Sequence, residues 1–387
     1  MNIILTHLGL VCSLGTTQDE IIHNAKLGNQ TCLNFISTDI PNETVPFFEV
    51  KDNKKTHMRC FRLLDITLEQ IMPQIVKLKE KYPLNKLGIV LGNTNTGVHE
   101  AQNDINKWLE TKTINKNFSF EKIELGSSAT YLKEKLGFLG PSYVISTACS
   151  SSAKAFQSAR NLISNNICDA VLVGGVDSRC SFANQGFFSL SALSLKHTNP
   201  FSKNRDGINL GEGAALFIME KEENIKNYET NEKSIKLLGI GESSDAYDLT
   251  SPDPTGNGAY TSMKRALEDA ALNADQINYI NMHGTGTIAN DKMEGIAIYD
   301  LFNDKILCAS TKSLTGHTLG ASGAIEAALS WLMLKFNFII PHKFDNDFDD
   351  EIPKIKLAKG NEDIELKNIL SNSFAFGGSN CSLILGK

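Results

Sequence analysis

The sequence lacks several features that mark common classes of protein. Its eight cysteines include no CxxC pair and no metal-ligand spacing with histidine, so the cysteines predict neither a structural zinc site nor a redox pair of that type. It also lacks an excess of positive charge, and a net charge of -6 at pH 7 argues against a protein that binds the nucleic-acid backbone. We therefore expect reduced, mostly buried thiols, no bound metal and no nucleic-acid partner.

Long apolar runs are missing as well. The longest near the C-terminus, at 331–334 and 338–340, is broken by Lys335 and Asn337 and is too short to span a bilayer. The first seven residues have no basic region followed by a long apolar stretch, which a secretion signal would have. These absences predict a cytoplasmic protein without a membrane span, whose first residues form a strand.

The composition that is present is that of an ordinary soluble protein. Hydrophobic residues make up 41% and charged residues 21% of the 387 residues. This length exceeds the usual size of one domain, so we expect two domains or one large fold built from two similar halves. A charged, asparagine-rich stretch at 220–233 is the best candidate for the connection, which predicts an N-terminal half of residues 1–233 and a C-terminal half of residues 234–387.

Strands and helices are predicted to alternate, as in an α/β protein with mostly parallel, buried strands. Short apolar runs predict strands at 87–91, 143–147, 170–173, 277–282 and 306–309, and apolar spacing of the helical period predicts helices at 98–111, 150–165, 291–302 and 321–335. Two of the strands end in Ser-Thr, at 146–147 and 310–311, and each precedes a helix rich in small residues. This internal echo is consistent with two related halves.

The segment Ser-Thr-Ala-Cys-Ser-Ser-Ser-Ala at 146–153 places Cys149 where a predicted strand gives way to a helix. The unpaired N–H groups and the positive dipole end of a helix N-terminus favour a thiolate, lower its pKa and supply donors for an oxyanion. Small neighbours leave room for a substrate. Taken alone, however, Cys149 is equally what a buried core cysteine looks like.

Two histidines occupy comparable places. His283 opens an H-G-T-G-T run that follows a predicted strand, in which glycine permits close backbone approach, and the hydroxyls of Thr285 and Thr287 can hydrogen-bond a polar, amide-containing ligand arm. His317 ends the run S-T-K-S-L-T-G-H at 310–317, which leads into a small-residue helix. A single histidine is usually structural, so neither run identifies a site by itself.

Two further features have both a functional and a structural explanation. Lys312 and Glu326 stand in a weakly charged stretch, and a buried lysine needs a partner, so the two residues could be a catalytic pair or a structural ion pair. The loop N-S-F-A-F-G-G-S-N at 372–380 lies between two apolar runs. Its adjacent glycines could aim an N–H at a reacting oxygen, with Phe374 and Phe376 as a wall or gate, or they could simply form a tight turn.

Five motifs together resemble the elongating β-ketoacyl-(acyl carrier protein) synthases of type II fatty acid and polyketide systems. In chain order they are T-A-C-S-S at 147–151, N-R-D-G-x-x-x-G-E-G at 204–213, H-G-T-G-T at 283–287, S-T-K-S-x-T-G-H at 310–317 and N-S-F-x-F-G-G-x-N at 372–380. Motifs in family order over nearly the whole chain are far more specific than any one of them. The resemblance implies a thiolase-like α/β fold, with two related halves in a layered αβαβα arrangement.

The resemblance also implies a reaction. Cys149 would take an acyl chain from acyl carrier protein, and a carbanion formed from malonyl-carrier protein by loss of carbon dioxide would attack it. By the same resemblance, the N–H groups of Cys149 and Phe376 would hold the oxyanion of the acyl group. His283 and His317, as neutral imidazoles with Nε2–H donors, would stabilise the enolate without a metal.

Supporting roles follow from the family in the same way. The resemblance implies that Lys312 orients His317 and is itself held by Glu326. It also implies that Phe376 is a gate that swings between acylation and condensation, with Phe374 packed beside it.

Residues of a substrate tunnel are implied as well. Thr285 and Thr287 match positions that hydrogen-bond a phosphopantetheine arm, and Thr250 or Ser251 is expected to line the same tunnel. No resident cofactor is expected, because the phosphopantetheine arrives on the carrier protein. Residues expected to affect the size of the acyl pocket are Thr94, Thr96, Gly97, Phe182 and Phe187.

An acidic carrier protein needs a basic landing patch. Lys54, Lys55, Arg59 and Arg62 precede an apolar helix-like run in the region where this family binds its carrier, which makes them candidates for docking. Ordinary solvated surface charge explains the same residues.

Members of the family are usually dimers, so we expect a homodimer or a heterodimer with a chain-length-factor-like homologue; the segments 241–254 and 281–294 resemble aryl-polyene-type synthases. Two alternatives to a synthase remain. A non-catalytic chain-length factor is disfavoured by Cys149, because such subunits typically lack the nucleophile. A thiolase would need a second cysteine as base near the C-terminus, where Cys381 is a poor match.

Overall fold

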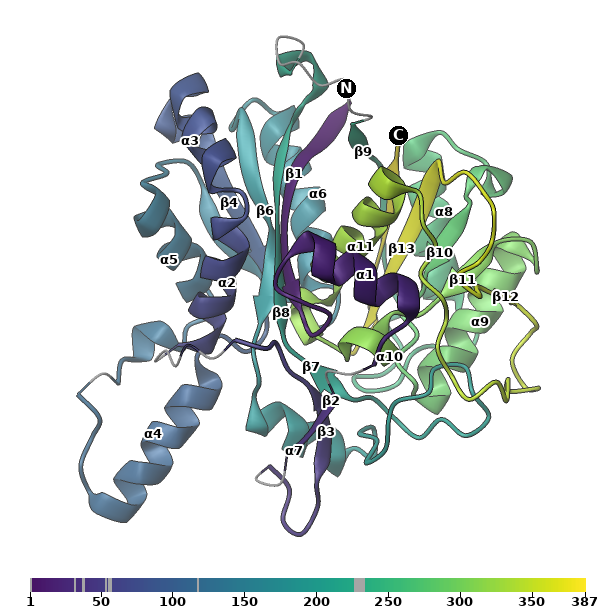
Figure 1. Cartoon of the computed structure of the whole chain (residues 1–387), viewed down its shortest axis with the longest axis horizontal. Coiled ribbons are helices and arrows are strands. Elements are labelled where there is room, and N and C mark those ends of the chain that lie inside the picture. Colours follow the sequence, from purple (N-terminus) through teal and green to yellow (C-terminus); the bar gives the residue numbers. More distant parts are fainter. Residues whose placement is uncertain are drawn as a thin grey trace.

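The strands join into two sheets, one of eleven strands and one of three (Figure 1). The structure is a computed structural model that describes residues 2–30, 33–36, 39–52, 54, 58–116, 118–225 and 234–387. The large sheet consists of β1 (Ile3–Cys12), β4 (Leu87–Gly92), β5 (Ser142–Ile145), β6 (Ala170–Asp177), β8 (Gly213–Lys221), β9 (Ile235–Ser244), β10 (Tyr279–Asn281), β11 (Leu307–Ala309), β12 (Lys356–Leu357), β13 (Asn368–Ala375) and β14 (Ser379–Gly386). The small sheet consists of β2 (Leu33–Ile36), β3 (Val45–Phe48) and β7 (Leu210–Gly211).

Helices fill the connections between these strands. They are α1 (Gln18–Leu27), α2 (Arg59–Glu69), α3 (Met72–Lys81), α4 (Val98–Thr111), α5 (Ser127–Leu136), α6 (Ser151–Ser164), α7 (Ser181–Ser189), α8 (Asn257–Ala270), α9 (Ile288–Phe302), α10 (Lys312–Thr315) and α11 (Ser322–Phe336). Short 3₁₀ turns lie at Leu84–Lys86, Phe120–Lys122, Glu222–Asn224, Ala274–Gln276 and Leu319–Ala321. The predicted helices and strands that flank the motifs are all present within a few residues of their expected bounds.

The order of strands in the large sheet repeats. One half runs β1-β8-β6-β4-β5 and the other β9-β14-β13-β10-β11, so in each half the first strand of the chain pairs with the last. In each half the first two pairings are antiparallel and the next two are parallel. This shared topology confirms the two related halves.

The expectation of mostly parallel strands is wrong for the inner part of each half. β14 follows β13 through a tight hairpin and must therefore run antiparallel to it, and β8 occupies the equivalent place beside β6. In the chain, the first copy of this strand pattern ends with β8 and the second copy begins with β9. Most of the predicted connection at 220–233 lies outside the described residues, and the boundary near residue 234 stays a prediction.

Five layers result from this arrangement. α6 and α11 pack against each other between the two halves of the sheet, α2 and α5 cover the outer face of the N-terminal half, and α8 and α9 cover the outer face of the C-terminal half (Figure 1). Helix α11 is buried all round from residue 322 to residue 334, as a helix that is apolar on every side must be. The expected αβαβα order is therefore confirmed.

Small residues let the two central helices approach closely. A Cβ on Gly92 of β4 would lie 2.1 Å from the backbone nitrogen of Ser152, and a Cβ on Gly323 would lie 2.8 Å from Ala153. The hydroxyl of Ser152 then accepts the backbone N–H of Ala324 at 2.9 Å. The Ser-Ser-Ser-Ala and Gly-Ala-Ser-Gly-Ala stretches thus join the start of α6 to the start of α11, which fixes the segments that precede both helices.

No described helix combines the length and the apolar composition that crossing a bilayer would require.

Candidate active site

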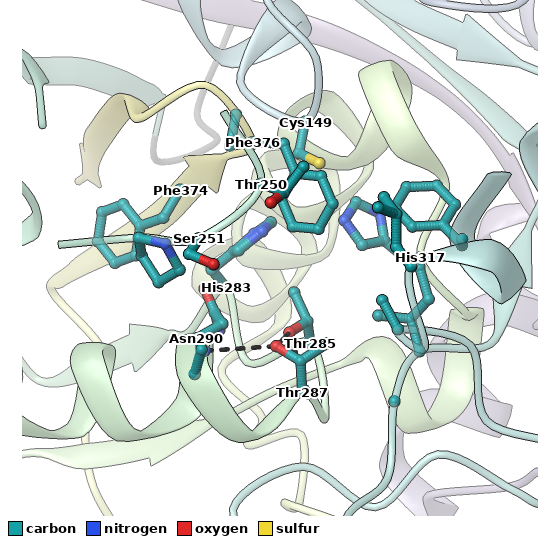
Figure 2. A pocket seen from close by; sticks show the side chains of 18 of the residues that line it. Cys149, Thr250, Ser251, His283, Thr285, Thr287, Asn290, His317, Phe374 and Phe376 are labelled. Atoms are coloured by element: carbon teal, nitrogen blue, oxygen red, sulfur yellow. Dashed lines mark hydrogen bonds between the residues drawn. The ribbon is translucent and has the colours of Figure 1, made fainter. Parts of the chain in front are cut away.

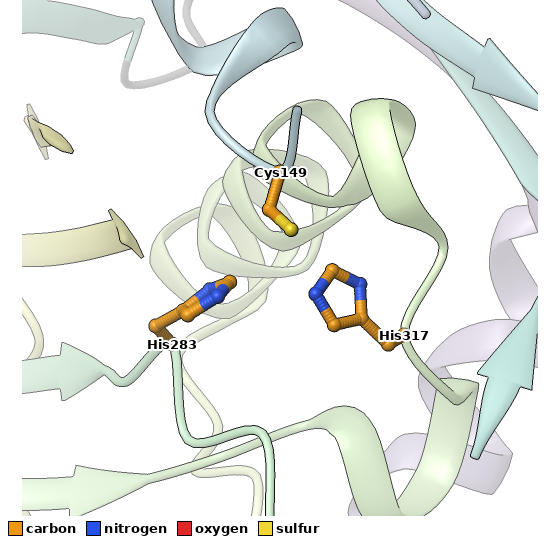
Figure 3. Close-up of side chains that lie close together, drawn as sticks. All are labelled: Cys149, His283 and His317. Atoms are coloured by element: carbon orange, nitrogen blue, oxygen red, sulfur yellow. The ribbon is translucent and has the colours of Figure 1, made fainter. Parts of the chain in front are cut away.

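The motif residues meet where strands of the two halves end. Cys149 lies just after β5, and Lys312 lies just after β11, the strand that occupies the equivalent position in the other half. His283 follows β10, and His317 lies between α10 and the turn that leads into α11. β10 and β11 are parallel neighbours, so His283 and Lys312, which follow them, lie together. Cys149 follows β5 at the opposite end of the strand order, and it meets them across more than 160 positions because α6 and α11 pack against each other between the two halves. In Figure 3 the sulfur of Cys149 points toward the two imidazole rings.

The turn that carries Cys149 has a constrained backbone. Ala148 has a φ of 52°, in the left-handed region that few residues other than glycine adopt, and α6 begins directly afterwards at Ser151. The backbone N–H groups of Cys149 and Phe376 both point at the thiol sulfur. The predicted pair of oxyanion donors therefore lies together, beside a side chain that is only 6% exposed.

Burial changes the acidity of this thiol in the direction opposite to the one that the helix position predicts. Desolvation raises the pKa of Cys149 to about 11, although the ammonium group of Lys312 and the N–H of Phe376 oppose the shift. The expectation of a lowered pKa is therefore wrong. The hydration free energy that the buried thiolate loses is larger than the stabilisation that the helix terminus and the lysine provide. In the resting site Cys149 is a thiol.

This pKa gives a testable pH profile. A thiol with a pKa near 11 gains a tenfold larger thiolate fraction with each pH unit up to about 10. We therefore expect the rate of alkylation of Cys149 by iodoacetamide, measured by peptide mass spectrometry, to rise about tenfold per unit from pH 7 to pH 9. A rate that levels off by pH 8 would show that the thiolate is stabilised and would contradict this assignment.

The hydrogen bonds around His317 determine its tautomer. The backbone N–H of Leu319 donates to its Nδ1 at 3.1 Å, so Nδ1 carries no proton and accepts the hydroxyl of Ser322, also at 3.1 Å. Burial, reinforced by the charge of Lys312, holds the pKa of His317 well below its usual range. His317 is therefore a neutral imidazole whose Nε2–H is free to donate into the site.

His283 has the same tautomer for a different reason. Its Nδ1 lies 3.3 Å from Nζ of Lys312, which can only donate, and burial together with Lys312 and His317 keeps its pKa far below the usual range. The two rings lie nearly perpendicular, with centroids 5.3 Å apart. The site thus presents two neutral Nε2–H donors, in agreement with the arrangement expected from the sequence.

The structure corrects the expected role of Lys312. Its ammonium group forms an ion pair with Glu326, as predicted, but its other hydrogen bonds go to the carbonyl oxygen and Nδ1 of His283. His317 is oriented by Leu319 and Ser322 instead. The prediction that Lys312 orients His317 is therefore wrong, because β10, which precedes His283, pairs with β11, which precedes the lysine.

Two residues that the sequence reasoning missed hold this arrangement in place. Glu294 on α9 accepts the backbone N–H groups of His283 at 2.8 Å and Gly284 at 2.6 Å. His342 accepts the N–H of Ser310 at Nδ1 and donates from Nε2 to the carbonyl of Pro200, so it supports the turn that leads to Lys312.

A cavity of about 260 Å³ opens above these groups (Figure 2). The predicted tunnel residues and both phenylalanines of the hairpin loop line it, together with the nucleophile and the two histidines: Cys149, Thr250, Ser251, His283, Thr285, Thr287, His317, Phe374 and Phe376. Thr285 and Thr287 hydroxyls lie 3.0 Å apart on its wall. Hydroxyl groups along the wall, among apolar and other polar side chains, suit an arm that carries amide groups.

Phe376 sits at the tip of the hairpin between β13 and β14, and its ring contacts that of Phe187 with centroids 5.6 Å apart. Gly377 and Gly378, with φ of 79° and 71°, allow the tight turn. The N–H of Gly377 donates to Leu249 at 2.8 Å, so the hairpin is bonded to the segment that carries Thr250.

The residues expected to set the size of the acyl pocket are dispersed. Of these, Phe187 lines the cavity and Phe182 is exposed to solvent. Thr94 donates its N–H and hydroxyl to Asp177. Thr94, Thr96, Gly97 and Phe182 do not line this cavity, whereas Phe187 does, and the effect of all five on the size of the acyl pocket stays a prediction.

The two arginines of the predicted basic patch form ion pairs within the chain. Arg59 forms an ion pair with Glu212 at 2.6 Å, and Arg62 forms one with Asp52 at 2.8 Å, so the two guanidinium groups hold neighbouring segments together. Lys54 is exposed, and Lys55 lies outside the described residues. Contact of these four residues with a carrier protein stays a prediction.

The cluster of Cys149, His283 and His317 places three possible metal-ligand atoms within 4.8 Å of one another. To bind an ion through Nε2, each imidazole would have to carry its proton on Nδ1. The donors Leu319 N–H and Lys312 Nζ occupy Nδ1 on the two rings. The ring tautomers thus suit hydrogen-bond donation rather than metal ligation.

Comparison with known families accounts for most of the chain. Residues 23–224 match the family described as "Beta-ketoacyl synthase, N-terminal domain", and residues 235–343 match "Beta-ketoacyl synthase, C-terminal domain". These two matches contain all five motifs except the C-terminal N-S-F-x-F-G-G-x-N.

Individual proteins align over two thirds or more of this chain. A 3-oxoacyl-[acyl-carrier-protein] synthase 2 from Coxiella burnetii is 29% identical over 410 residues, covering 100% of this chain and 98% of that protein. The corresponding synthase from Rhizobium meliloti is 38% identical over 275 residues, covering 68% of this chain and 64% of that protein. A solved ketosynthase, ApeO, in complex with its chain length factor ApeC from Xenorhabdus doucetiae, has a TM-score of 0.93 at 34% identity and covers 100% of this chain and 98% of its own.

Proposed function

The chain belongs to the β-ketoacyl synthase family, and from that premise we propose how its site forms a carbon–carbon bond. It is a β-ketoacyl-(acyl carrier protein) synthase, an acyltransferase that elongates an acyl chain by decarboxylative condensation with a malonyl unit. One observation carries the assignment of roles: a thiol, two N–H donors and two Nε2–H donors converge on one cavity. A non-catalytic subunit is not favoured, because the nucleophile is present and its donors are in place.

The first half-reaction loads Cys149. Its sulfur attacks the thioester carbonyl of an acyl chain on a carrier protein, and the negative oxygen of the tetrahedral intermediate accepts hydrogen bonds from the N–H groups of Cys149 and Phe376. The carbon–sulfur bond to the carrier breaks, and the proton of the thiol leaves on the pantetheine sulfur. Because that proton departs with the product, the raised pKa of Cys149 requires no permanent thiolate.

The second half-reaction generates the carbon nucleophile. A malonyl thioester places its carbonyl oxygen between the Nε2–H groups of His283 and His317, its carboxyl group leaves as carbon dioxide, and the electron pair of the broken bond forms an enolate. Neutral imidazoles suit this task because they are weak acids, so they donate hydrogen bonds to the enolate oxygen without transferring a proton to it. Their lowered pKa keeps them neutral at pH 7.

The enolate carbon then attacks the acyl group on Cys149. The oxyanion forms again at the N–H pair of Cys149 and Phe376, and its collapse expels the sulfur of Cys149 and leaves a β-ketoacyl chain on the carrier. The sulfur regains a proton from solvent. Lys312 and Glu326 act through His283 in this scheme, because the lysine holds the Nδ1 of that ring.

The arm that delivers both substrates is not a resident group of the enzyme. Thr285 and Thr287 on one wall of the cavity, and Thr250 and Ser251 on another, would hydrogen-bond the amides of phosphopantetheine on the carrier protein. We accordingly propose that the enzyme needs no cofactor of its own.

We propose a dimer formed at the free edge of the N-terminal half. β5 is the last strand of that sheet and is only partly buried, and an unpaired edge invites another strand. Helix α4 projects from the rest of the fold in Figure 1 and exposes Ile105, Trp108 and Leu109, which a partner would cover. The similar ketosynthase ApeO is paired with a chain length factor, so the partner is either a second copy or a homologue of that kind.

Intact-mass spectrometry tests the activity and the nucleophile together. We expect the protein to gain an acyl mass from acyl-carrier protein and to lose it again when malonyl-carrier protein is added, with a β-ketoacyl-carrier as product. Cys149→Ser should gain none, whereas Cys168→Ala, which changes another buried cysteine, should behave like the unchanged protein. Acylation of Cys149→Ser would contradict the assignment of the nucleophile.

A further inference from the structure

The N-R-D-G-x-x-x-G-E-G motif at 204–213 supplies no group to the bonds that the reaction makes and breaks. Its residues from 207 onward are buried, and β7 lies among them. We call residues 205–211 the crosspiece, because this segment is hydrogen-bonded to the loop after His283 at one end and to His317 at the other. It therefore touches the supports of both enolate donors.

The first end of the crosspiece is bonded to the loop that follows His283. The backbone N–H of Gly207 donates to the carbonyl oxygen of Gly286 at 3.0 Å. The buried guanidinium group of Arg205 donates to the carbonyl oxygen of Thr287 at 3.3 Å. A Cβ on Gly286 would lie 2.8 Å from the carbonyl oxygen of Gly207, so the two segments approach too closely for a side chain to fit between them. This end of the crosspiece is thus fixed to the loop.

The second end of the crosspiece takes both backbone hydrogen bonds of His317. The N–H of His317 donates to the carbonyl oxygen of Asn209 at 2.7 Å, and its own carbonyl accepts the N–H of Gly211 at 3.1 Å. His317 therefore pairs with Leu210 as a residue of a neighbouring parallel strand would, and β3 pairs with the opposite edge of β7. A Cβ on Gly211 would lie 2.2 Å from the carbonyl oxygen of Thr315, so only glycine permits this contact. His317 is thus attached to the small sheet.

The two imidazoles are consequently held by different parts of the chain. The backbone of His283 bonds to Glu294 and Lys312, which both follow it in the C-terminal half. The backbone of His317 bonds to the crosspiece, which precedes β8. An enolate oxygen needs both Nε2–H groups at hydrogen-bond distance at the same time, so its stabilisation depends on the distance between these two supports. A segment that is bonded to both loops can fix that distance.

Asn209 anchors the crosspiece through its side chain, which is buried with the residue only 1% exposed. Its amide nitrogen donates to the carbonyl oxygens of Ser194 and Lys196 at 3.0 and 2.9 Å, and its amide oxygen accepts the N–H of Thr198 at 2.7 Å. The hydroxyl of Thr198 in turn donates to the carbonyl oxygen of Gly207 at 2.8 Å. Removing the amide would leave these buried backbone groups without their partner, and the crosspiece would lose its attachment at the position that accepts the N–H of the histidine.

We propose that Asn209 is a positioning residue for decarboxylation: it anchors the crosspiece, and the crosspiece holds His317 at the distance from His283 that the enolate oxygen requires. This rests on the proposed function, in which both imidazoles donate to one oxygen. The acylation step does not depend on that distance, because its oxyanion accepts hydrogen bonds from the N–H groups of Cys149 and Phe376. Loss of the Asn209 side chain should therefore impair the second half-reaction and spare the first.

Rates of the two half-reactions test this separation. Acylation of Cys149 by hexanoyl-acyl carrier protein is followed by intact-mass spectrometry, and release of labelled carbon dioxide from malonyl-carrier protein by the acylated enzyme gives kcat and KM. We expect Asn209→Ala to lower the kcat of decarboxylation at least about tenfold and to leave its KM and the acylation rate within about twofold, because the hydrogen bonds to the enolate strengthen in the transition state. Equal losses in both half-reactions would overturn the proposal.

A double variant shows whether Asn209 acts through His317. In His317→Phe the donor is gone and its position no longer matters, so adding Asn209→Ala should change the remaining rate of decarboxylation by less than about twofold. If the two losses multiply instead, Asn209 acts by another route and the proposal is wrong. Asn209→Ser, which keeps a hydroxyl in place of the amide, is measured alongside, with the same separation expected, so that the result does not depend on the folding of one variant.

The matched control is Gln70→Ala. The amide group of Gln70 also bonds to the backbone at three points, namely the N–H and carbonyl oxygen of Leu10 and the carbonyl oxygen of Thr16, but it follows α2 and does not line the cavity. We expect this variant to lose stability in urea unfolding and to keep both rates. If the unchanged chain neither forms an acyl adduct nor releases carbon dioxide, it is the proposed function that fails rather than the role of Asn209.

Discussion

Replacing His283 or His317 by phenylalanine should lower condensation by about 10²–10³-fold in each case while Cys149 still becomes acylated. Each substitution removes one Nε2–H donor from the enolate site. The donors of the acylation step are the backbone N–H groups of Cys149 and Phe376, which neither substitution alters. The two half-reactions should therefore come apart: the acyl adduct forms at a near-normal rate, and the release of carbon dioxide from malonyl-carrier protein nearly stops.

Acyl adducts measured by intact-mass spectrometry, and labelled carbon dioxide measured in the same reaction, distinguish these steps. A suitable control is His99→Phe, because His99 bonds to Ser181 and lies away from the cavity, so this variant should keep both rates. If the rate of acylation fell as far as the rate of decarboxylation in the histidine variants, the two half-reactions would share one oxyanion site. That result would contradict two separate sites.

The positions of the reactive groups could be predicted from the sequence because of how the fold is built. The motifs that contain Cys149, His283 and Lys312 each follow a short apolar strand. Parallel neighbouring strands bring His283 and Lys312 together, whereas Cys149, in the other half, joins them through the packing of α6 on α11. The small residues after Cys149 were also informative, since close packing of α6 on α11 permits nothing larger.

What could not be predicted depends on contacts between distant segments. The ion pairing of Arg59 could not be predicted, because its partner, Glu212, lies 153 positions away and leaves no local pattern. The same holds for Lys312. It bonds to His283 rather than to His317 because β10, which precedes His283, is the strand that lies beside β11. The acidity of Cys149 was missed because burial, which a sequence does not show directly, outweighs the helix terminus.

The pair of Lys312 and Glu326 should show the second large effect, and it should depend on pH. Both side chains are almost fully buried, so Lys312→Met leaves Glu326 without its cation, at a cost of about 3–5 kcal/mol in the free energy of unfolding when the carboxyl is ionised. Burial already raises the pKa of Glu326 to about 7 although Lys312 opposes the shift, and without the lysine the pKa rises further.

The sign of the pH effect follows from proton binding. In Lys312→Met the folded state keeps a proton on Glu326 at pH values where the unfolded chain has lost it, so the variant is most stable near pH 5 and loses stability as the pH rises through 7 toward 9. The double variant Lys312→Met/Glu326→Leu has no charge to bury and should recover most of the loss at pH 8, yet condensation should stay low because Nδ1 of His283 has lost its donor. Urea unfolding at pH 5.5 and pH 8 measures both effects. A Lys312→Met variant equally destabilised at the two pH values would show that Glu326 finds another partner and that the lysine is not needed to balance its charge.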